Sequence, residues 1–334
     1  MKGIVTATAV AVAIALMAFG TWYGLNSATG YSGTPEPISI GIPPNEQSAL
    51  VFIAEEQRLF ARNGLSATVK VYDTALAAIN AMKNDEVDIA QSAEYPIVTE
   101  ALKKARITVI GIVDRHQTVS LVARKDRGIE NISDIEGKRI GVPHGTITEF
   151  YLGRFLNLHG ISLQDVTTVD MSFAQSADAL ASGTVDAFQV RNKDINPIRE
   201  RLGSNVITWP SQSGQVAYEV ISGRSEWVNS HPRLIDRLLN SILQAEEFAI
   251  RHPAEAMAIL QRRLNYDDAY LASVGPQHQY SLSLEQSLVL AMEDEARWMI
   301  GNNLTGEKQT PNFIDYIHVE GLKAVRPGAV NIIR

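Results

Sequence analysis

Residues 142–160, VPHGTITEFYLGRFLNLHG, join a turn of small residues to the start of an apolar helical pattern. Gly145 and Thr146 fall at the predicted N-terminus of this helix, and Ile147 and Thr148 follow in its first turn. A helix N-terminus leaves backbone N–H groups unpaired and carries about half a positive charge, so it attracts anions. The threonine hydroxyls would add donors. The alternative is an ordinary turn in which Thr146 caps the helix.

A second set of polar residues follows two short apolar strands that belong to an internal repeat. NAMKNDEVDIAQ (80–91) aligns without gaps with DALASGTVDAFQ (178–189), and each copy reads as a helix end, a turn and a buried strand. Polar residues follow each copy: SAEYP at 92–96 and RNKD at 191–194. Loops beyond the C-termini of parallel strands hold ligands. The repeat therefore predicts two similar lobes that direct one loop each at a shared cleft.

The side chains in these two loops carry opposite charges. Ser92, Glu94 and Tyr95 lie in the first loop, and Arg191 and Asn192 lie in the second. A desolvated Glu94 would repel a simple anion and favour an amino group, unless it faces water. The fork of Arg191 suits a sulfonate, carboxylate or phosphate, unless it is solvated or pairs with Glu94. If both side chains face the cleft, a zwitterion such as an aminosulfonate satisfies each.

Five further residues occupy corresponding positions at strand ends. Asn45 and Gln47 follow the predicted strand 38–42 and either bind ligand or cap the next helix. Asp114 and His116 follow the predicted strand 107–113, where a structural hydrogen bond is the alternative for His116. Tyr218 would supply an aromatic wall or pack in the core.

The elements that must position these residues alternate between short strands and helices. Predicted strands at 38–42, 67–72, 107–113, 138–142 and 166–170 are separated by helical patterns, and long amphipathic helices dominate from residue 231 onward. This alternation predicts an α/β protein with mainly parallel sheets covered by helices.

Composition excludes several classes of protein. The chain has 334 residues, a net charge of −7 and no cysteine, which rules out disulfides, thiolate catalysis and cysteine-ligated metals. Lys and Arg are dispersed, so no nucleic-acid partner is expected. The seven histidines show no HExxH spacing, and no phosphate-binding or nucleophile-elbow motif is present. We therefore predict no metal site, no cofactor and no enzyme activity.

The N-terminus reads as a targeting segment. A single lysine precedes the apolar run IVTATAVAVAIALMAFG (4–20). This pattern predicts a secretory signal peptide within residues 1–30, or an uncleaved membrane tether through residues 4–25, followed by a linker at 31–37. Either alternative places the remainder in the periplasm or outside the cytoplasm.

Several stretches, in this order, resemble the solute-binding proteins of ABC importers for nitrate, sulfonates, taurine and thiamine-pyrimidine precursors. They are IAEEQRLFARNGLSATV (53–69), ALAAINAMKNDEVDIAQSAEYP (75–96), ISDIEGKRIGVPHGT (132–146), ALASGTVDAFQV (179–190) and HPAEAMAILQRRL (252–264). The resemblance implies a two-lobed periplasmic-binding-protein type II fold with two crossover segments, here near 122–125 and 221–224. Lobe one would be 38–122 plus 223–334, and lobe two 123–222.

The resemblance also implies a function. The protein would capture a small-molecule ligand between its lobes and deliver it to the transmembrane subunits of an ABC permease and their ATPase. A sulfonate, taurine or nitrate-type anion is the first expectation. The alternatives are a thiamine-pyrimidine precursor or another cationic or heteroaromatic metabolite, or a sensory role for a membrane-tethered receptor module.

Overall fold

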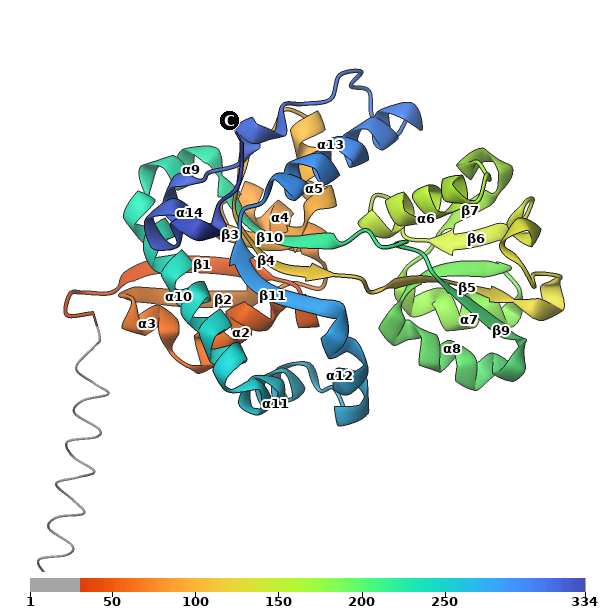
Figure 1. Cartoon of the computed structure of the whole chain (residues 1–334), viewed down its shortest axis with the longest axis horizontal. Coiled ribbons are helices and arrows are strands. Elements are labelled where there is room, and N and C mark those ends of the chain that lie inside the picture. Colours follow the sequence, from red (N-terminus) through yellow and green to blue (C-terminus); the bar gives the residue numbers. More distant parts are fainter. Residues whose placement is uncertain (1–30, 334) are drawn as a thin grey trace, which may run out of the picture.

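The computed structural model describes residues 31–333, so the predicted signal or anchor segment lies outside the described residues. In the described part, no helix is long and apolar enough to cross a membrane. Two α/β lobes lie side by side, each built on its own sheet (Figure 1). The predicted α/β architecture with two lobes is confirmed.

The first lobe is built on a six-stranded sheet in the order β11-β4-β10-β3-β1-β2. Its strands are β1 (Glu36–Ile42), β2 (Leu65–Val71), β3 (Ile89–Ala93), β4 (Ile107–His116), β10 (Ala217–Arg224) and β11 (His278–Ser283). Its helices are α2 (Ala49–Glu56), α3 (Leu59–Arg62), α4 (Ala75–Lys83), α5 (Glu94–Leu102), α9 (Ser225–Ser230), α10 (Pro232–Arg251), α11 (Pro253–Leu264), α12 (Asp268–Val274), α13 (Gln286–Gly301) and α14 (Glu320–Val325). A single large apolar core joins these elements.

The second lobe has a five-stranded sheet in the order β7-β6-β8-β5-β9. Its strands are β5 (Val119–Arg124), β6 (Arg139–Val142), β7 (Thr167–Asp170), β8 (Ala187–Arg191) and β9 (Val206–Pro210), and its helices are α6 (Ile147–Leu158), α7 (Ser176–Ser182) and α8 (Ile195–Leu202). Two apolar clusters cover the two faces of this sheet.

The internal repeat corresponds to equivalent units in the two lobes. β3 runs parallel to β1, and β8 runs parallel to β6. Asp88, before β3, accepts the backbone N–H of Ser39 at 2.8 Å, and Asp186, before β8, accepts that of Arg139 at 3.1 Å. The aspartate at the same position of each copy thus ties its strand to the neighbouring parallel strand.

The chain crosses between lobes earlier than the sequence predicts. β4 ends in the first sheet at His116 and β5 begins in the second at Val119, while the return lies between β9 and β10, at 211–216. The predicted boundaries, 122/123 and 222/223, therefore divide β5 and β10. The polar turn SQSG at 211–214, with positive φ at Ser213 and Gly214, marks the real return.

Gln212 joins the two crossing segments. Its side-chain oxygen accepts the backbone N–H groups of Thr118 and Val119 at 2.6 and 3.0 Å. Its side-chain nitrogen donates to the carbonyl oxygens of His116 and Gln215, each at 3.1 Å. Gln212 is 2% exposed, so water does not compete for these four hydrogen bonds.

We expect Gln212→Ala to lower the free energy of unfolding by about 2–4 kcal/mol, because buried backbone groups of both crossings lose their partners. Urea unfolding followed by circular dichroism measures the loss. Gln164→Ala, an exposed glutamine of the second lobe, serves as the control and should change stability by less than about 0.5 kcal/mol. Equal, small losses in both variants would contradict a structural role for Gln212.

Candidate ligand-binding cleft

A pocket of about 320 Å³, part of it open solvent, lies between the lobes beside the first crossing. It is lined by Asn45, Glu46, Gln47, Thr118, Arg191, Asn192, Lys193, Tyr270 and Val274. Four of the predicted ligand residues, Asn45, Gln47, Arg191 and Asn192, therefore come together there. The segment after β8 reaches this pocket, but residues 92–96 do not line it, so only one of the two repeat copies directs its polar residues here.

The first lobe contributes an acidic wall that the sequence analysis did not identify. Glu46 is 4% exposed and accepts hydrogen bonds from the hydroxyls of Tyr270 at 2.9 Å and Tyr266 at 3.2 Å. Burial, reinforced by the charge of Glu46, raises the pKa of both phenols. The tyrosines therefore stay protonated and hold the carboxylate in place.

The second lobe contributes Lys193, which was also missed. Its ammonium donates to the hydroxyl of Tyr266 at 3.2 Å and has no carboxylate partner among residues 31–333. Burial, followed by the nearby charge of Arg191, lowers the pKa of Lys193. Glu46 and Asp194 lie near enough to act on its charge but form no direct ion pair with it, so this partly desolvated ammonium is suited to an acidic group of a ligand.

Arg191 lies at the pocket, but its fork is already occupied. It ends β8 and binds Asp194 with nitrogen–oxygen distances of 2.8 and 3.2 Å. Its guanidinium carbon also lies 4.3 Å from the centre of the Phe173 ring. The ion pair between Arg191 and Glu94, which the sequence left open as an alternative, does not form. Arg191 is neutralised by Asp194 instead.

The predicted anion site at the start of α6 is likewise satisfied from within. The backbone N–H of Gly145 donates to Oε2 of Glu149 at 2.8 Å. The Thr146 hydroxyl donates to the carbonyl of Pro143 at 2.7 Å and lies 2.5 Å from the Thr148 hydroxyl. Ile147 packs against the core of the first lobe. A ligand anion here would meet the buried carboxylate of Glu149.

The polar residues 92–96, predicted as a loop, belong to a strand and a helix instead. Ser92 lies inside β3 and its hydroxyl donates to the carbonyl of Ala93, while Glu94 and Tyr95 open helix α5. Asp114 and His116 likewise belong to β4 rather than to a following loop. Both predicted strands ended before these polar residues. The observed strands β3 and β4 continue through them, because their side chains are buried at the lobe junction.

Glu94 lies on the other side of the crossings, near α6 and α13. It is 1% exposed, and its Oε2 accepts the backbone N–H of Tyr218 at 3.0 Å. No donor reaches Oε1 of Glu94 or either carboxylate oxygen of Glu295, which is 0% exposed. Burial raises the pKa of Glu94 to about 8 and, with the charge of Glu94, raises the pKa of Glu295. Burial thus favours the protonated forms of both carboxyl groups.

Glu219 supplies a further buried carboxyl group on β10. It is 3% exposed, accepts a hydrogen bond from Nε2 of Gln91 at 3.0 Å, and burial raises its pKa to about 7. The oxygens of Gln91 and Gln189, which end the two repeat copies, have no donor either. The lobe junction is therefore rich in unpartnered acceptors.

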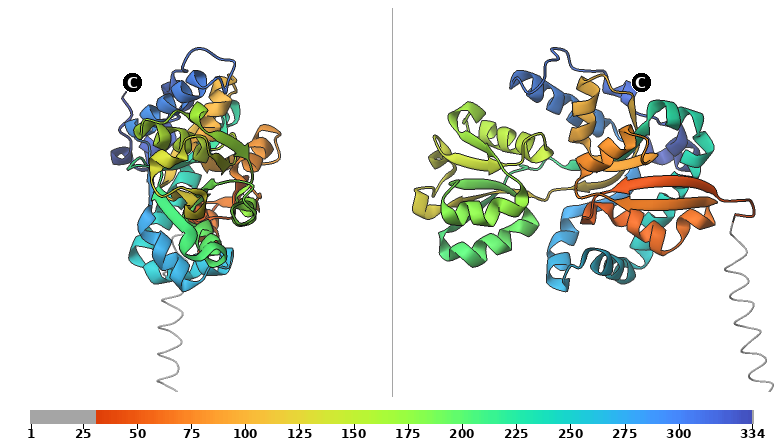
Figure 2. Two further views of the ribbon diagram at one scale, coloured as in Figure 1. Left: turned by 90° about the vertical axis from the view of Figure 1, so that its right-hand side faces the viewer. Right: turned by 180° about the vertical axis from the view of Figure 1, so that it is seen from behind.

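Contacts between the lobes close both rims of the cleft. On one side, Arg154 of α6 binds Asp294 of α13 at 2.8 Å. On the other, the side chain of Asn192 donates to Gln277, just beyond α12, at 2.6 Å. Two views show α13 and α12 on opposite sides of the crossings (Figures 1 and 2). Polar contacts thus bridge the two lobes on both sides of the crossings.

A family model described as NMT1/THI5 like matches residues 45–256. The chain belongs to the NMT1/THI5-like family. This membership confirms the predicted relationship to solute-binding proteins. The matched range covers the second lobe and much of the first, but leaves out β1, β11 and the helices after residue 256.

Two relatives and one solved structure extend the comparison. A protein of Brucella abortus (strain 2308), named only as a binding protein, is 26% identical over 79% of this chain and 83% of its own. A Bacillus subtilis (strain 168) protein named for binding aliphatic sulfonates is 22% identical over 70% and 71%. The crystal structure of the periplasmic aliphatic sulphonate binding protein SsuA from Escherichia coli has a TM-score of 0.73, with 14% identity over 85% and 98%. The periplasmic-binding-protein fold is thereby confirmed.

The NMT1/THI5-like protein should lose stability as pH rises from 5 to 8. Glu94 and Glu219 ionise near 8 and 7 when folded and at their usual 4.5 when unfolded. The folded state therefore holds protons that the unfolded state has released, and stability falls through this window. Glu94→Gln removes one such group. Between pH 5 and pH 8 we therefore expect the melting temperature of this variant to fall by several degrees less than that of the wild type.

The control for this prediction is Glu130→Gln, which alters an exposed carboxyl group. Its melting temperature should follow the wild-type pH dependence. Identical pH profiles for Glu94→Gln and the wild type would show that Glu94 is ionised in the folded protein at neutral pH.

Proposed function

We propose that this protein binds a small solute bearing N–H donors between its lobes and delivers it to an ABC permease. The observation that carries the proposal is the set of buried acceptor atoms at the lobe junction that have no donor: Oε1 of Glu94, both carboxyl oxygens of Glu295, and the side-chain oxygens of Gln47, Gln91 and Gln189. A protonated amine or an aminopyrimidine edge would supply the missing donors. Closure of the lobes on such a ligand follows because these contacts exist only in the closed state.

A simple anion such as nitrate or an alkanesulfonate has less support. The two groups that the sequence offered for anions are neutralised by the protein itself, Arg191 by Asp194 and the start of α6 by Glu149. A second anion placed beside these carboxylates would meet repulsion in a poorly solvated site. The thiamine-pyrimidine class therefore moves ahead of the simple-anion class.

An aminosulfonate such as taurine is the second candidate, and Lys193 favours it. The lysine forms no direct ion pair and reaches the acidic wall through Tyr266, so a zwitterion could place its sulfonate at Lys193 and its amine toward Glu46. The relative named for binding aliphatic sulfonates also supports this candidate. Both candidates share an N–H group, which is the central element of the proposal.

We further propose that the protein works outside the cytoplasm, with residues 1–30 as signal peptide or anchor, and acts as a binding protein rather than an enzyme. The chain of hydrogen bonds between Lys193, Tyr266 and Glu46 links the two lobes beside the pocket, which supports a binding role. The permease and its ATPase would be the partners, as for ABC importers.

A matched panel of ligands tests the class of solute. We expect taurine or 4-amino-5-hydroxymethyl-2-methylpyrimidine to raise the melting temperature, whereas ethanesulfonate, which is taurine without its amine, and nitrate do not. A ligand at 100 times its Kd adds about 2.7 kcal/mol of stability, which a thermal-shift assay detects. Ethanesulfonate binding as tightly as taurine would contradict the requirement for an N–H donor.

Two variants separate the ends of the ligand. Glu46→Gln should weaken taurine binding by about 10–100-fold, because the acceptor placed beside its amine is lost. Lys193→Gln should weaken the binding of taurine but leave the affinity for the pyrimidine nearly unchanged. Lys125→Gln, at an exposed lysine, is the matched control and should leave both affinities unchanged.

A further inference from the structure

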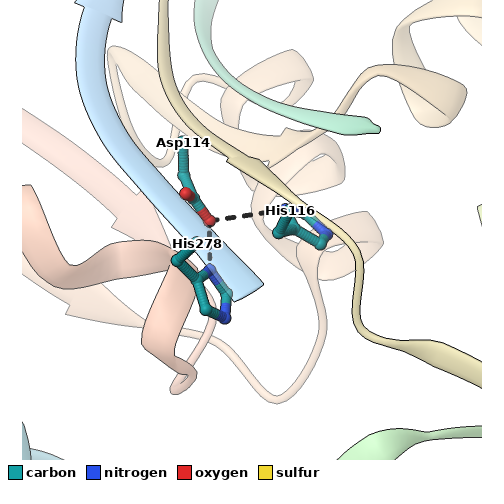
Figure 3. Close-up of side chains that lie close together, drawn as sticks. All are labelled: Asp114, His116 and His278. Carbon is teal, nitrogen blue, oxygen red and sulfur yellow. Dashed lines mark hydrogen bonds and ion pairs between the residues drawn. The ribbon is translucent and has the colours of Figure 1, made fainter. Parts of the chain in front are cut away.

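Three metal-ligating side chains meet at the hinge end of the first sheet. Asp114 and His116 lie two residues apart on β4, so their side chains share one face. His278 opens β11 directly opposite His116 in the antiparallel ladder. Figure 3 shows the carboxylate of Asp114 between the two imidazole rings. Residues far apart in the sequence are thus brought together by strand pairing.

The donor atoms of the three residues are close together and held in place. Oδ2 of Asp114 lies 2.6 Å from Nδ1 of His278 and 3.4 Å from Nδ1 of His116. Oδ1 of Asp114 accepts the backbone N–H of Gln279 at 3.1 Å, which fixes the carboxylate. One ligand atom from each residue lies within 4.8 Å of the others, and residues 31–333 contain no other such group.

Two buried nitrogens in this group have no hydrogen-bond partner. Nδ1 of His116, which lies 3.4 Å from Oδ2 of Asp114, and Nε2 of His278, whose Nδ1 binds that carboxylate, both lack a hydrogen bond, although the residues are only 6% and 8% exposed. A buried polar atom without a partner is costly and calls for an unseen water or ion. Glu219 lies opposite Asp114 on β10, so a second carboxyl group is available to balance a cation.

We propose that Asp114, His116 and His278 bind a divalent transition-metal ion of the zinc class. Two imidazole nitrogens and one carboxylate oxygen suit Zn²⁺, whereas Ca²⁺ and Mg²⁺ prefer sites made of oxygens. Bonds of about 2.0–2.2 Å to a tetrahedral ion place its donors about 3.3–3.5 Å apart. The observed 2.6 and 3.4 Å separations reach that range with small side-chain rotations.

The position gives the ion a structural consequence. The carbonyl of His116 accepts a hydrogen bond from Gln212, and the next residue, Gln117, donates its N–H to the carbonyl of Gln277 at 3.1 Å. An ion held by His116 and His278 would therefore fasten β11 to β4 where the first crossing begins. Metal binding stabilises the folded state because the unfolded chain has no such site.

Zinc titration of the purified, EDTA-treated protein against a competing chromogenic chelator tests the proposal. We expect one ion per chain, a higher melting temperature with Zn²⁺, and an X-ray absorption edge that reports two imidazole ligands. His116→Ala and His278→Ala should each weaken Zn²⁺ binding by at least about 10-fold. His252→Ala, which removes a histidine paired with Glu255 and half exposed, should bind as the wild type does.

The outcomes separate an ion site from a hydrogen-bonded cluster. Failure of the wild type to bind Zn²⁺, or binding that survives both His116→Ala and His278→Ala, would overturn the proposal. If a variant does not fold, the X-ray absorption spectrum of the zinc-loaded wild type tests the proposal instead. A zinc ion coordinated without two imidazole ligands would contradict the proposed site. Magnesium, added in place of zinc, should leave the melting temperature unchanged.

Discussion

The hydrogen bonds of Gln212 at the paired crossings are the constraint on which the rest of the structure depends. One buried side chain satisfies backbone groups from both segments that join the lobes. Because the crossings are tied to each other, the strand ends of both lobes point at one small volume. The groups that line the pocket, from Asn45 in one lobe to Lys193 in the other, are positioned by that arrangement.

Much of the fold could be predicted from sequence, because apolar periodicity and the internal repeat report on buried strands. The aspartates of the two repeat copies, Asp88 and Asp186, have the same role in each lobe. The lobe boundaries were wrong because β10 continues as an apolar run through the expected crossing. The sequence did not predict β11, because its residues, HQYSLS, mix polar and apolar types. The strand also pairs only with β4, which is distant in the sequence.

The candidate site was harder to predict, because its chemistry depends on which groups neutralise one another. Arg191 and the start of α6 have the right residue types for an anion, yet Asp194 and Glu149 already occupy them. These partners lie three and four residues away from Arg191 and Gly145, so a search for local carboxylates could have found them. The partners of Glu94, Glu295 on α13 and Tyr218 on β10, come from distant elements and carry no local signal.

Burial of carboxyl groups without donors links the site to its function. Glu94 and Glu219 hold protons near neutral pH because burial disfavours their charged forms, and a ligand N–H group would change that. The most direct test is titration calorimetry of the binding amine in two buffers of different ionisation enthalpy at pH 7. The account predicts that binding releases protons from the buried carboxyl groups. Proton uptake, or no exchange at all, would contradict it.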